Sequence, residues 1–585
     1  MTSNGPRYAV IGGGLAGLAT TIRIAEQGNP VDLFSLVRVS RSHSVCAQGG
    51  INGAVNTKGE GDSPWIHADD TVYGGDFLAN QPPILEMCEA APGIINLFDR
   101  MGVTFNRTAE GLLDFRRFGG TKVHRTAYSG ATTGQQLMYA LDQQVRRYEE
   151  DGLVVKYEGW EFLRVVLDDG GVARGVVAMD LASLEIKAFP SDAIMIATGG
   201  PGVIFGRSTN SVINTGGANS NLYRQGAWYA NGEFVQIHPT AIPGRDKRRL
   251  ISESVRGEGG RVWIPRDGKP WYFLEEWYPA YGNLVPRDIA AQAIYKVVYD
   301  MGLGIDGEEA VYLDVTHKDP EELTAKLGGV LEIYEKFMGE DPRKVPMKVF
   351  PAVHYSMGGL WVDFDLMTNL PGVFGGGEAN YEYHGANRLG ANALLSCTFD
   401  GIKGGPKMIE YVAGLSSMSA DAASAPFDRA IGEEEKRLQK VLGMTGGKEN
   451  PYDLHAELGD WMTRYCTVVR HEARLLETDA KIAEIMERWK QIALPDTGTW
   501  MNQSVVFARQ LWEMLELARV MVAGAIARQE SRGVHLRPDY PDRNDEDWLR
   551  STIATWTPDG PELHYEPVDT SLIPPRPRQY QKDIR

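Results

Sequence analysis

The stretch from Tyr8 to Ser35, YAVIGGGLAGLATTIRIAEQGNPVDLFS, decides the fold of this chain. Tyr8 to Ile11 is a short apolar run of the kind that forms a buried strand. Leu18 to Ala25 carries apolar residues at helical spacing, and a second strand-like run, Val31 to Phe34, follows. A strand, a glycine-rich turn, a helix and a second strand in this order predict a βαβ unit that binds a dinucleotide.

The glycines of the turn each have a physical role in such a unit. Gly12 permits the tight turn, Gly14 lets the backbone approach a pyrophosphate, and Gly17 allows close packing of helix on strand. The helix N-terminus adds amides and the positive end of a dipole. The strand context disfavours the alternative, a glycine loop without a cofactor. Ser35 departs from the usual pattern, because an acidic residue normally ends the second strand and binds the ribose.

Composition changes along the chain indicate several domains, as expected for 585 residues. A strand over Ala193 to Ala197 ends in Thr198-Gly199-Gly200, which indicates a second close approach to the cofactor. The segment from His238 to about Val349 is rich in Pro, Trp and Tyr, and we interpret it as an inserted domain. We predict an α/β fold with a dinucleotide-binding domain in two parts (1–238 and 350–425), an inserted α+β capping domain (239–349), a helical domain (426–535) and an extended C-terminal segment (536–585).

Composition also excludes some functions. A net charge of −17 argues against a nucleic-acid partner, which would need clustered Lys and Arg. The four cysteines are widely separated and form no CxxC pair, so we expect no zinc site, no iron–sulfur ligands and no other metal in this chain. They fit a reducing compartment. The N-terminus lacks the apolar run of a signal peptide, and no run reaches the roughly 18 apolar residues of a membrane span. We therefore expect a chain that reaches a membrane only through a partner.

His43 is the most informative histidine. It lies in Arg41-Ser42-His43-Ser44-Val45-Cys46-Ala47-Gln48-Gly49-Gly50, shortly after the glycine turn and among small residues. This placement puts it against the reactive ring of a cofactor and suits a covalently tethered flavin. For His67, His317, His455, His471 and His564 we expect ordinary roles in polar surroundings. His238, His354 and His384 stand beside glycine or proline, where backbone geometry selects the sequence, and for His238 and His354 we expect a role in a site.

Charged residues complete a candidate site. Glu253 and Arg256 are three residues apart and would share one face of a helix, where they form an ion pair or exchange a proton. An ordinary surface ion pair is the alternative, and Arg287 equally fits a structural salt bridge. Two histidines, a hydroxyl and two arginines together suit a small dicarboxylate, because arginine grips a carboxylate with two parallel hydrogen bonds.

These motifs together resemble the flavoprotein subunits of succinate dehydrogenase and fumarate reductase. The similarity runs from Tyr8 to about Trp548, and it is nearest to the Bacillus-like, menaquinone-using branch. The segments that carry it are Gly12 to Gly17, Ser42-His43-Ser44 with Gln48-Gly49-Gly50, His238-Pro239-Thr240, Arg256 to Gly260, His354 to Gly359 and His384 to Arg388. Two further segments match that branch in particular, residues 53–64 and 275–281.

The resemblance implies a Rossmann-like FAD-binding domain and a role for each matching residue. His43 would carry FAD through an 8α-histidyl bond, and Arg287 would move the substrate proton, relayed through Glu253 and Arg256. A free arginine is a poor base, since its pKa lies above about 12, so this role requires the other two residues and a closed cap that excludes water. The implied substrate contacts are His238, Ser252 (Thr in many members), His354, Arg388 and Phe118. The implied FAD contacts are Gly12, Gly14, Gly17, Gln48, Gly49, Gly50, Thr198, Gly199, Glu378, Arg388, Ala393 and Leu394. Gly217 stands where other branches have an Asp near FAD.

The resemblance also implies a function and partners. Succinate is oxidised to fumarate with hydride transfer to FAD, and electrons pass to an iron–sulfur subunit and on to quinone, as in respiratory complex II of the citric acid cycle. A haem-containing membrane anchor would hold the complex at the cytoplasmic face of the cell membrane. Three alternatives stay open: a quinol-fumarate reductase that runs the reverse reaction, an L-aspartate oxidase, and an inactive scaffold for an electron-transfer partner.

Overall fold

The centre of the molecule is a parallel sheet of five strands that begins with the predicted βαβ unit. A computed structural model describes residues 5–244 and 248–581. The strand order is β19-β10-β1-β2-β6, and all neighbouring pairs are parallel. The strands are β1 (Tyr8–Ile11), β2 (Val31–Ser35), β6 (Val154–Glu158), β10 (Ala193–Ile196) and β19 (Val373–Gly375). The predicted strands at Tyr8, Val31 and Ala193 are therefore confirmed.

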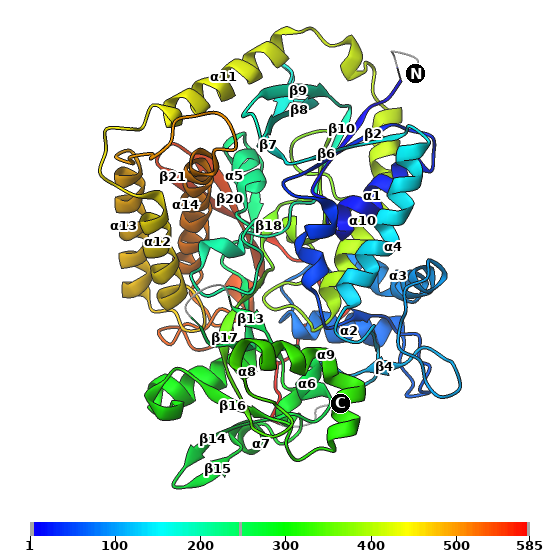
Figure 1. Cartoon of the computed structure of the whole chain (residues 1–585), viewed down its shortest axis with the longest axis vertical. Helices are drawn as coiled ribbons and strands as arrows, with labels where there is room; N and C mark the ends of the chain where they lie inside the picture. Colours follow the sequence, from blue (N-terminus) through cyan, green and yellow to red (C-terminus); the bar gives the residue numbers. More distant parts are fainter. Residues whose placement is uncertain (1–4, 245–247, 582–585) are drawn as a thin grey trace.

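Both faces of this sheet are covered, as expected for a parallel sheet. Val10 and Leu33 face one core together with α1 (Leu15–Ala25), α4 (Thr133–Glu150) and α10 (Asn392–Ala413). The intervening residues Ala9 and Ile11 face an antiparallel sheet of β7 (Trp160–Leu167), β8 (Ala173–Asp180) and β9 (Ile186–Pro190). Figure 1 shows α1, α4 and α10 stacked on one side, with β7 to β9 above the sheet.

The glycine turn is shaped by close backbone contacts. Gly12 has φ +115°, and a Cβ atom there would lie 2.1 Å from the carbonyl oxygen of Ala197, the residue after β10. A Cβ at Gly17 would lie 1.8 Å from the carbonyl oxygen of Gly12. α1 begins at Leu15, three residues before the predicted start, so Gly17 lies in its first turn.

The inserted segment forms a cap around a six-stranded sheet of order β13-β12-β17-β16-β14-β15. Its strands are β12 (Val235–Ile242), β13 (Arg249–Leu250), β14 (Arg261–Arg266), β15 (Lys269–Trp271), β16 (Val311–Asp314) and β17 (Met347–Ser356). Its helices are α6 (Ser254–Gly257), α7 (Phe273–Trp277), α8 (Arg287–Tyr295) and α9 (Pro320–Met338). β12 and β17 pair across the predicted boundaries at 238 and 349, and the exact boundaries stay predictions. The cap is the green lower part of Figure 1.

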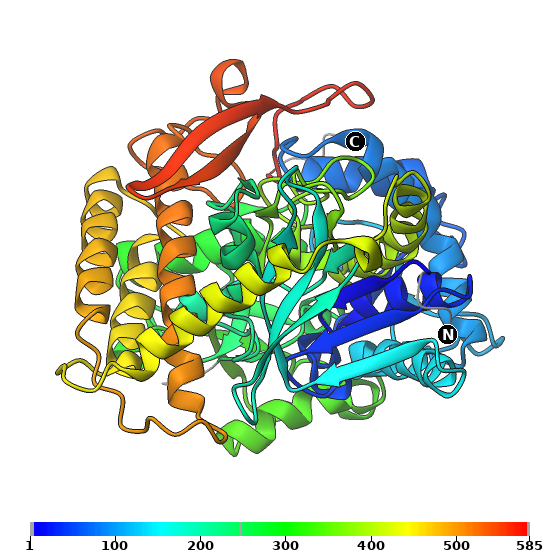
Figure 2. The same ribbon diagram turned by 90° about the horizontal axis from the view of Figure 1, so that it is seen from above.

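The helical region consists of α11 (Ala425–Leu442), α12 (Pro451–Tyr465), α13 (Glu472–Trp489) and α14 (Gln503–Ala527). The C-terminal segment, predicted to be extended, contains a short helix and two strands. After the short α15 (Asp545–Trp548), β20 (Arg550–Thr557) and β21 (Gly560–Pro567) form a hairpin that joins β11 (Tyr229–Ala230) and β18 (Gly359–Leu360) in one sheet. Figure 2 shows this hairpin, in red, lying along one edge of the molecule.

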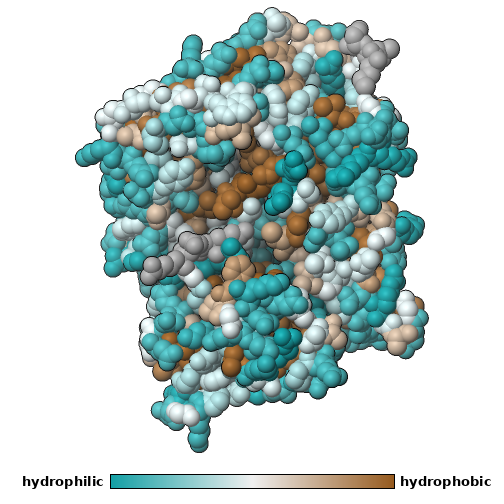
Figure 3. Space-filling view, in the orientation of Figure 1, coloured by the Kyte–Doolittle hydropathy of each residue, from teal (hydrophilic) through white to brown (hydrophobic). Residues whose placement is uncertain are grey.

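Smaller elements complete the part of the chain outside the cap. They are α2 (Pro64–Gly74), α3 (Gln81–Arg100), α5 (Gly217–Arg224) and a three-stranded sheet of β3 (Ile51–Asn52), β4 (Phe115–Arg116) and β5 (Thr126–Ala127). Across residues 5–244 and 248–581, none of the helices combines the length and apolar character that a membrane span requires. The face in Figure 3 is mostly hydrophilic, with hydrophobic residues gathered across the middle.

We expect Gly17→Ala to destabilise the protein, because the new methyl group meets backbone rather than a movable side chain. Crowding of this kind costs roughly 1–3 kcal/mol. The matched control is Gly93→Ala in α3, where a Cβ meets nothing within 4 Å and where Ala is favoured by up to about 1 kcal/mol. Thermal unfolding midpoints of the two variants are compared with the parent. Equal midpoints for Gly17→Ala and the parent would show that the tight turn is not needed.

Candidate active site

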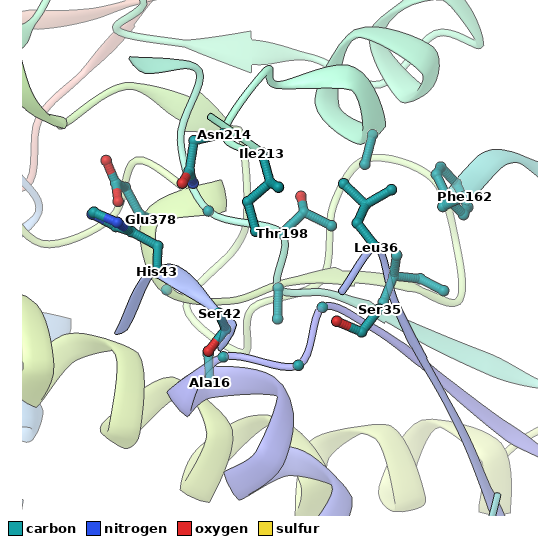
Figure 4. A pocket seen from close by; sticks show the side chains of 18 of the residues that line it. Ala16, Ser35, Leu36, Ser42, His43, Phe162, Thr198, Ile213, Asn214 and Glu378 are labelled. Carbon is teal, nitrogen blue, oxygen red and sulfur yellow. The ribbon is translucent and has the colours of Figure 1, made fainter. Parts of the chain in front are cut away.

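A long pocket follows the carboxyl end of the parallel sheet. Its walls include the glycine turn, Ser35, Thr198 and Gly199, and Glu378 from the turn after β19. Figure 4 shows Ser35, Leu36 and Phe162 toward one end and His43 with Glu378 at the other. Ligands of open α/β sheets bind at this edge, so the pocket has the place expected for a dinucleotide.

The exposed backbone and the polar groups of the pocket fit FAD. Gly12, Gly14 and Gly199 bring bare backbone to the wall, and Gly199 has φ +76°. Thr198 Oγ1 and Asn214 Oδ1 are buried and have no hydrogen-bond partner in the described part of the chain. Buried polar groups are normally satisfied, so these two atoms indicate a polar ligand. Gly17 does not line the pocket; its effect is the helix packing described above.

The two departures noted in the sequence have different surroundings. Ser35 lies on the pocket wall, where the usual acid is missing. At Gly217, a Cβ would lie only 2.4 Å from Glu513 Oε2, so a carboxyl group from α14 fills the space that a side chain would take. Asn221 donates to the other oxygen of Glu513 at 3.0 Å. Burial raises the pKa of Glu513 to about 7.

His43 lies where this pocket meets a second cavity. It begins the 3-10 turn η2 (His43–Cys46) and lines both spaces. Ser211 donates its backbone N–H to His43 Nδ1 at 3.2 Å. Nδ1 is therefore an acceptor in this arrangement, and the ring orientation is fixed from one side.

The second cavity, of about 450 Å³, lies between the FAD-side domain and the cap. It brings together the predicted residues from segments far apart in the sequence. The predicted site residues that line it are His43, Gln48, Gly49, Gly50, Phe118, His238, Ser252, Glu253, Arg287, His354, Glu378, Arg388, Ala393 and Leu394. Arg248 and Arg249 also line it. Arg256 is not among them and stands behind Glu253.

Glu253 joins the charged groups at one end of the cavity. Arg287 Nε donates to its Oε2 at 2.7 Å, and Arg256 Nη2 donates to its Oε1 at 2.9 Å. All three side chains are at most 6% exposed, so this is no surface ion pair. Burial alone would raise the pKa of Glu253, but the two guanidinium groups outweigh it and hold the pKa below its usual value. The backbone N–H of Gly119 adds a third hydrogen bond at 3.0 Å.

His238 and His354 face each other across β12 and β17, with ring centroids 5.0 Å apart. Burial lowers the pKa of both rings well below the usual value, and Arg287 adds to the shift. The backbone N–H of Thr240 donates to His238 Nδ1 at 3.2 Å, so the proton of the neutral ring belongs on Nε2. His238 Nε2 is buried and has no partner in the described residues, which leaves a donor for a bound anion.

Arg388 reaches the cavity from the FAD-binding domain. It lies 4.4 Å above the ring of Tyr355. Burial, followed by repulsion from Arg287, lowers the pKa of Arg388 to about 9. Burial also raises the pKa of Glu378 to about 7, and Ser356 donates its N–H to that carboxyl group at 2.9 Å. Phe118, only 1% exposed, supplies an apolar wall.

Some site residues were missed in the sequence. Gln236 Oε1 accepts from Arg287 Nη1 at 2.8 Å, and its position two residues before His238 on one strand was the signal that could have revealed it. Thr209 Oγ1 lies 2.7 Å from His354 Nδ1 and carried no recognisable signal. His67, expected to have an ordinary role, is fully buried, and its Nε2 lies 3.0 Å from Asn392 Oδ1. His384 lies near Ser396, 3.2 Å away, and does not line the cavity.

Comparisons with known proteins agree with this geometry. Residues 7–394 match the family model of the FAD binding domain, and residues 455–580 match that of the fumarate reductase flavoprotein C-terminus. The chain is 65% identical to the succinate dehydrogenase flavoprotein subunit of Bacillus subtilis, covering 98% of each chain. It is 32% identical to the fumarate reductase flavoprotein subunit of Escherichia coli, covering 98% of this chain and 95% of that one. A solved structure of E. coli quinol fumarate reductase superposes with a TM-score of 0.93 at 30% identity and covers 99% of both chains.

The lowered pKa of His354 predicts a loss of stability in mild acid. Below about pH 6.5 the unfolded chain binds a proton at this position that the folded chain refuses, so the stability present above that pH is lost as the pH falls. Between pH 6.5 and 5.5 one such group costs about 1 kcal/mol. We expect His354→Gln to lose correspondingly less stability over this range in denaturant titrations. The control His317→Gln, at an exposed position, should follow the parent. If His354→Gln also follows the parent, the ring is not held neutral.

Proposed function

Because the chain belongs to the family of succinate dehydrogenase and fumarate reductase flavoprotein subunits, we propose that it oxidises succinate to fumarate at the cavity between its FAD-binding domain and its cap. The proposal rests on the buried ion pairs that Glu253 makes with Arg287 and Arg256. Arg287 and Glu253 line the same cavity as Arg388, His238 and His354. By family, the chain is an FAD-binding oxidoreductase. The charged side chains of the cavity indicate its substrate.

The charges of the cavity match a dicarboxylate. Four arginines line the cavity: Arg248, Arg249, Arg287 and Arg388. Of its two carboxyl groups, Glu253 is shared with Arg256, and burial raises the pKa of Glu378 to about 7, so positive charge exceeds negative charge there. Burying unpaired charge is costly, so an occupant with two negative charges is favoured. Arg388 and the Nε2–H of His238 would hold carboxylate oxygens, with Ser252 and His354 as further contacts.

Arg287 would take the substrate proton as a neutral side chain, after giving one of its own protons to Glu253. Oxidation of succinate removes a hydride from one methylene carbon and a proton from its neighbour, and FAD supplies the hydride acceptor when bound. Arg287 sits on the first turn of α8 and reaches the cavity, and its Nε–H already donates to Glu253. Glu253 and Arg256 then form a hydrogen-bonded route by which the proton is shared and passed on. The side chains of Arg287, Glu253 and Arg256 are at most 6% exposed, which keeps bulk water from this route.

We further propose that His43 carries FAD through an 8α-histidyl bond. The turn η2 places its ring where the dinucleotide pocket opens into the substrate cavity. Nδ1 accepts the N–H of Ser211, so the bond would be formed by Nε2. Such a link makes a flavin a stronger oxidant, which suits a reluctant hydride donor such as succinate. Gln48, Gly49, Gly50, Ala393 and Leu394 would enclose the same end of the cofactor.

Reduced FAD needs an outlet for its electrons, and the four cysteines of this sequence are too scattered to bind a cluster. We propose an iron–sulfur partner subunit, a haem-containing membrane anchor and quinone as acceptor, with this chain held at the cytoplasmic face of the membrane. The relatives named above are themselves subunits of succinate dehydrogenase or fumarate reductase.

Fumarate reduction is the second candidate, because the same residues serve both directions and the chain resembles fumarate reductases along its whole length. The 65% identity to a succinate dehydrogenase subunit favours succinate oxidation. L-Aspartate oxidase holds FAD without a covalent bond, so the proposed tether at His43 separates the two activities.

We expect Arg287→Gln to lower succinate oxidation with an artificial dye acceptor by roughly 10²–10⁴-fold, the usual contribution of a positioned acid or base. FAD should remain attached, because Arg287 lies at the cap side of the cavity. The matched control is Arg261→Gln, which breaks a partly exposed pair with Glu275 elsewhere on the cap and should leave turnover unchanged. Substantial turnover by Arg287→Gln would remove it from the proton route.

The tether is tested on denatured protein. After acid precipitation and gel electrophoresis, the band should stay fluorescent, and the band of His43→Ser should not. Loss of the flavin from the parent protein on denaturation would mean that His43 is not a tether. That result would favour L-aspartate oxidase activity.

A further inference from the structure

The last described residues form a strap, residues 569–581, that runs from the β20–β21 hairpin to the cap. In Figure 1 the red end of the chain descends from the upper part of the molecule toward the green cap. The strap is first pinned by Gln81 at the start of α3, whose side chain is buried. Gln81 Oε1 accepts from the N–H groups of Leu572 and Ile573 at 3.0 and 2.7 Å, and its Nε2 donates to the Ile573 carbonyl at 2.8 Å.

The strap next crosses α2 of the FAD-binding domain. Arg576 pairs with Asp69 at 2.7 Å. Tyr73 exchanges two hydrogen bonds with Gln579: its hydroxyl accepts the Gln579 N–H at 2.7 Å and donates to the Gln579 carbonyl at 2.9 Å. These contacts fix the backbone on both sides of Arg578.

Arg578 then reaches across to the cap. It makes a two-point ion pair with Asp288, in which Nη2 lies 3.1 Å from Oδ1. Tyr580 packs edge-on between Tyr73 of α2 and Tyr281 of the cap, with centroids 5.6 and 5.1 Å away. The Arg578 side chain is 7% exposed and that of Asp288 is fully buried, so water screens this pair little.

Asp288 is the residue after Arg287, and hydrogen bonds connect the strap to the Arg287 guanidinium. Asn387 Nδ2 donates to Asp288 Oδ1 at 3.0 Å. Gln236 Nε2 donates to Asn387 Oδ1 at 2.9 Å, and Arg287 Nη1 donates to Gln236 Oε1 at 2.8 Å. A buried polar path thus runs from Arg578 through Asp288, Asn387 and Gln236 to Arg287. Gln236 also donates to the Arg388 carbonyl at 2.7 Å, so the path touches both cavity arginines.

An interdomain clamp without effect on the site is the simpler reading of such contacts. It explains Arg576 and Tyr580, which join surfaces away from the cavity. It does not explain why a charged group is buried directly after Arg287. A buried carboxylate without its cation would be costly, and Arg578 is the cation that the chain brings to Asp288.

We propose that Arg578 is a positioning residue for the reaction: it holds Asp288, and through Asn387 and Gln236 it fixes the guanidinium of Arg287 in the closed arrangement of cap and FAD-binding domain. The strap then couples closure of the cap to the geometry of proton transfer. This inference rests on the proposed role of Arg287. A misplacement of about 1 Å, produced far from the reacting atoms, can cost about 100-fold in rate.

The test compares Arg578→Gln, Arg578→Lys and the control Arg576→Gln in the purified holoenzyme, with succinate and a dye acceptor. Arg576 lies in the same strap, but its partner Asp69 is on the FAD-binding domain. We expect Arg578→Gln to lower kcat by about 10- to 100-fold with little change in KM, and to increase the solvent deuterium isotope effect on kcat as proton transfer becomes slower. Arg578→Lys should recover part of the rate, and Arg576→Gln should stay near the parent.

The double variant Asp288→Asn, Arg578→Gln removes both charges, so it leaves no unpaired carboxylate in the interior. It replaces Arg578→Gln in the test if the single variant fails to fold. It should fold and still show the low kcat and the larger isotope effect. Parent values of kcat and of the isotope effect in either Arg578→Gln or the double variant would overturn the proposal, as would an equal loss in Arg576→Gln. A parent enzyme that does not oxidise succinate would instead overturn the proposed function.

Discussion

One buried carboxylate, Glu253, is the constraint on which the rest of the site depends. It accepts hydrogen bonds from Arg287 on α8, from Arg256 on α6 and from the backbone of Gly119 in the other domain. Without it, two guanidinium groups would be buried unpaired, and breaking a buried pair of this kind costs about 3–5 kcal/mol. The same carboxylate joins the cap to the FAD-binding domain, and we propose that it receives the proton from Arg287.

The site is built from short segments whose positions are fixed elsewhere in the fold. The parallel sheet and its glycine contacts set the dinucleotide pocket, and η2 places His43 at its inner end. The pairing of β12 with β17 brings the rings of His238 and His354 together. The C-terminal strap contacts Asp288 through Arg578, and we propose that this contact positions Arg287. The positions of the site residues therefore depend on the packing of the FAD-binding domain, the cap and the C-terminal strap.

Local patterns carried most of what the sequence predicted. The βαβ unit, the insertion and the helical region were visible because apolar periodicity and glycine placement reflect local structure, and family motifs pointed to the residues that line the cavity. Thr209 and Arg578 were missed because a single polar side chain gains its role only from a partner distant in sequence. The hairpin β20–β21 was missed because its two strands complete a sheet begun by β11, over 300 residues earlier. The carboxyl group of Glu513 beside Gly217 likewise follows from packing alone.

The central claim is that the buried charge of this cavity selects a dicarboxylate without an amino group. It is tested most directly by measuring dye-coupled oxidation of succinate and of L-aspartate by the purified holoprotein, with malonate as competitor. An ammonium group placed between Arg287 and Arg388 would be repelled, so the account predicts turnover of succinate, competitive inhibition by malonate and no oxidation of L-aspartate. Oxidation of L-aspartate with none of succinate would contradict it.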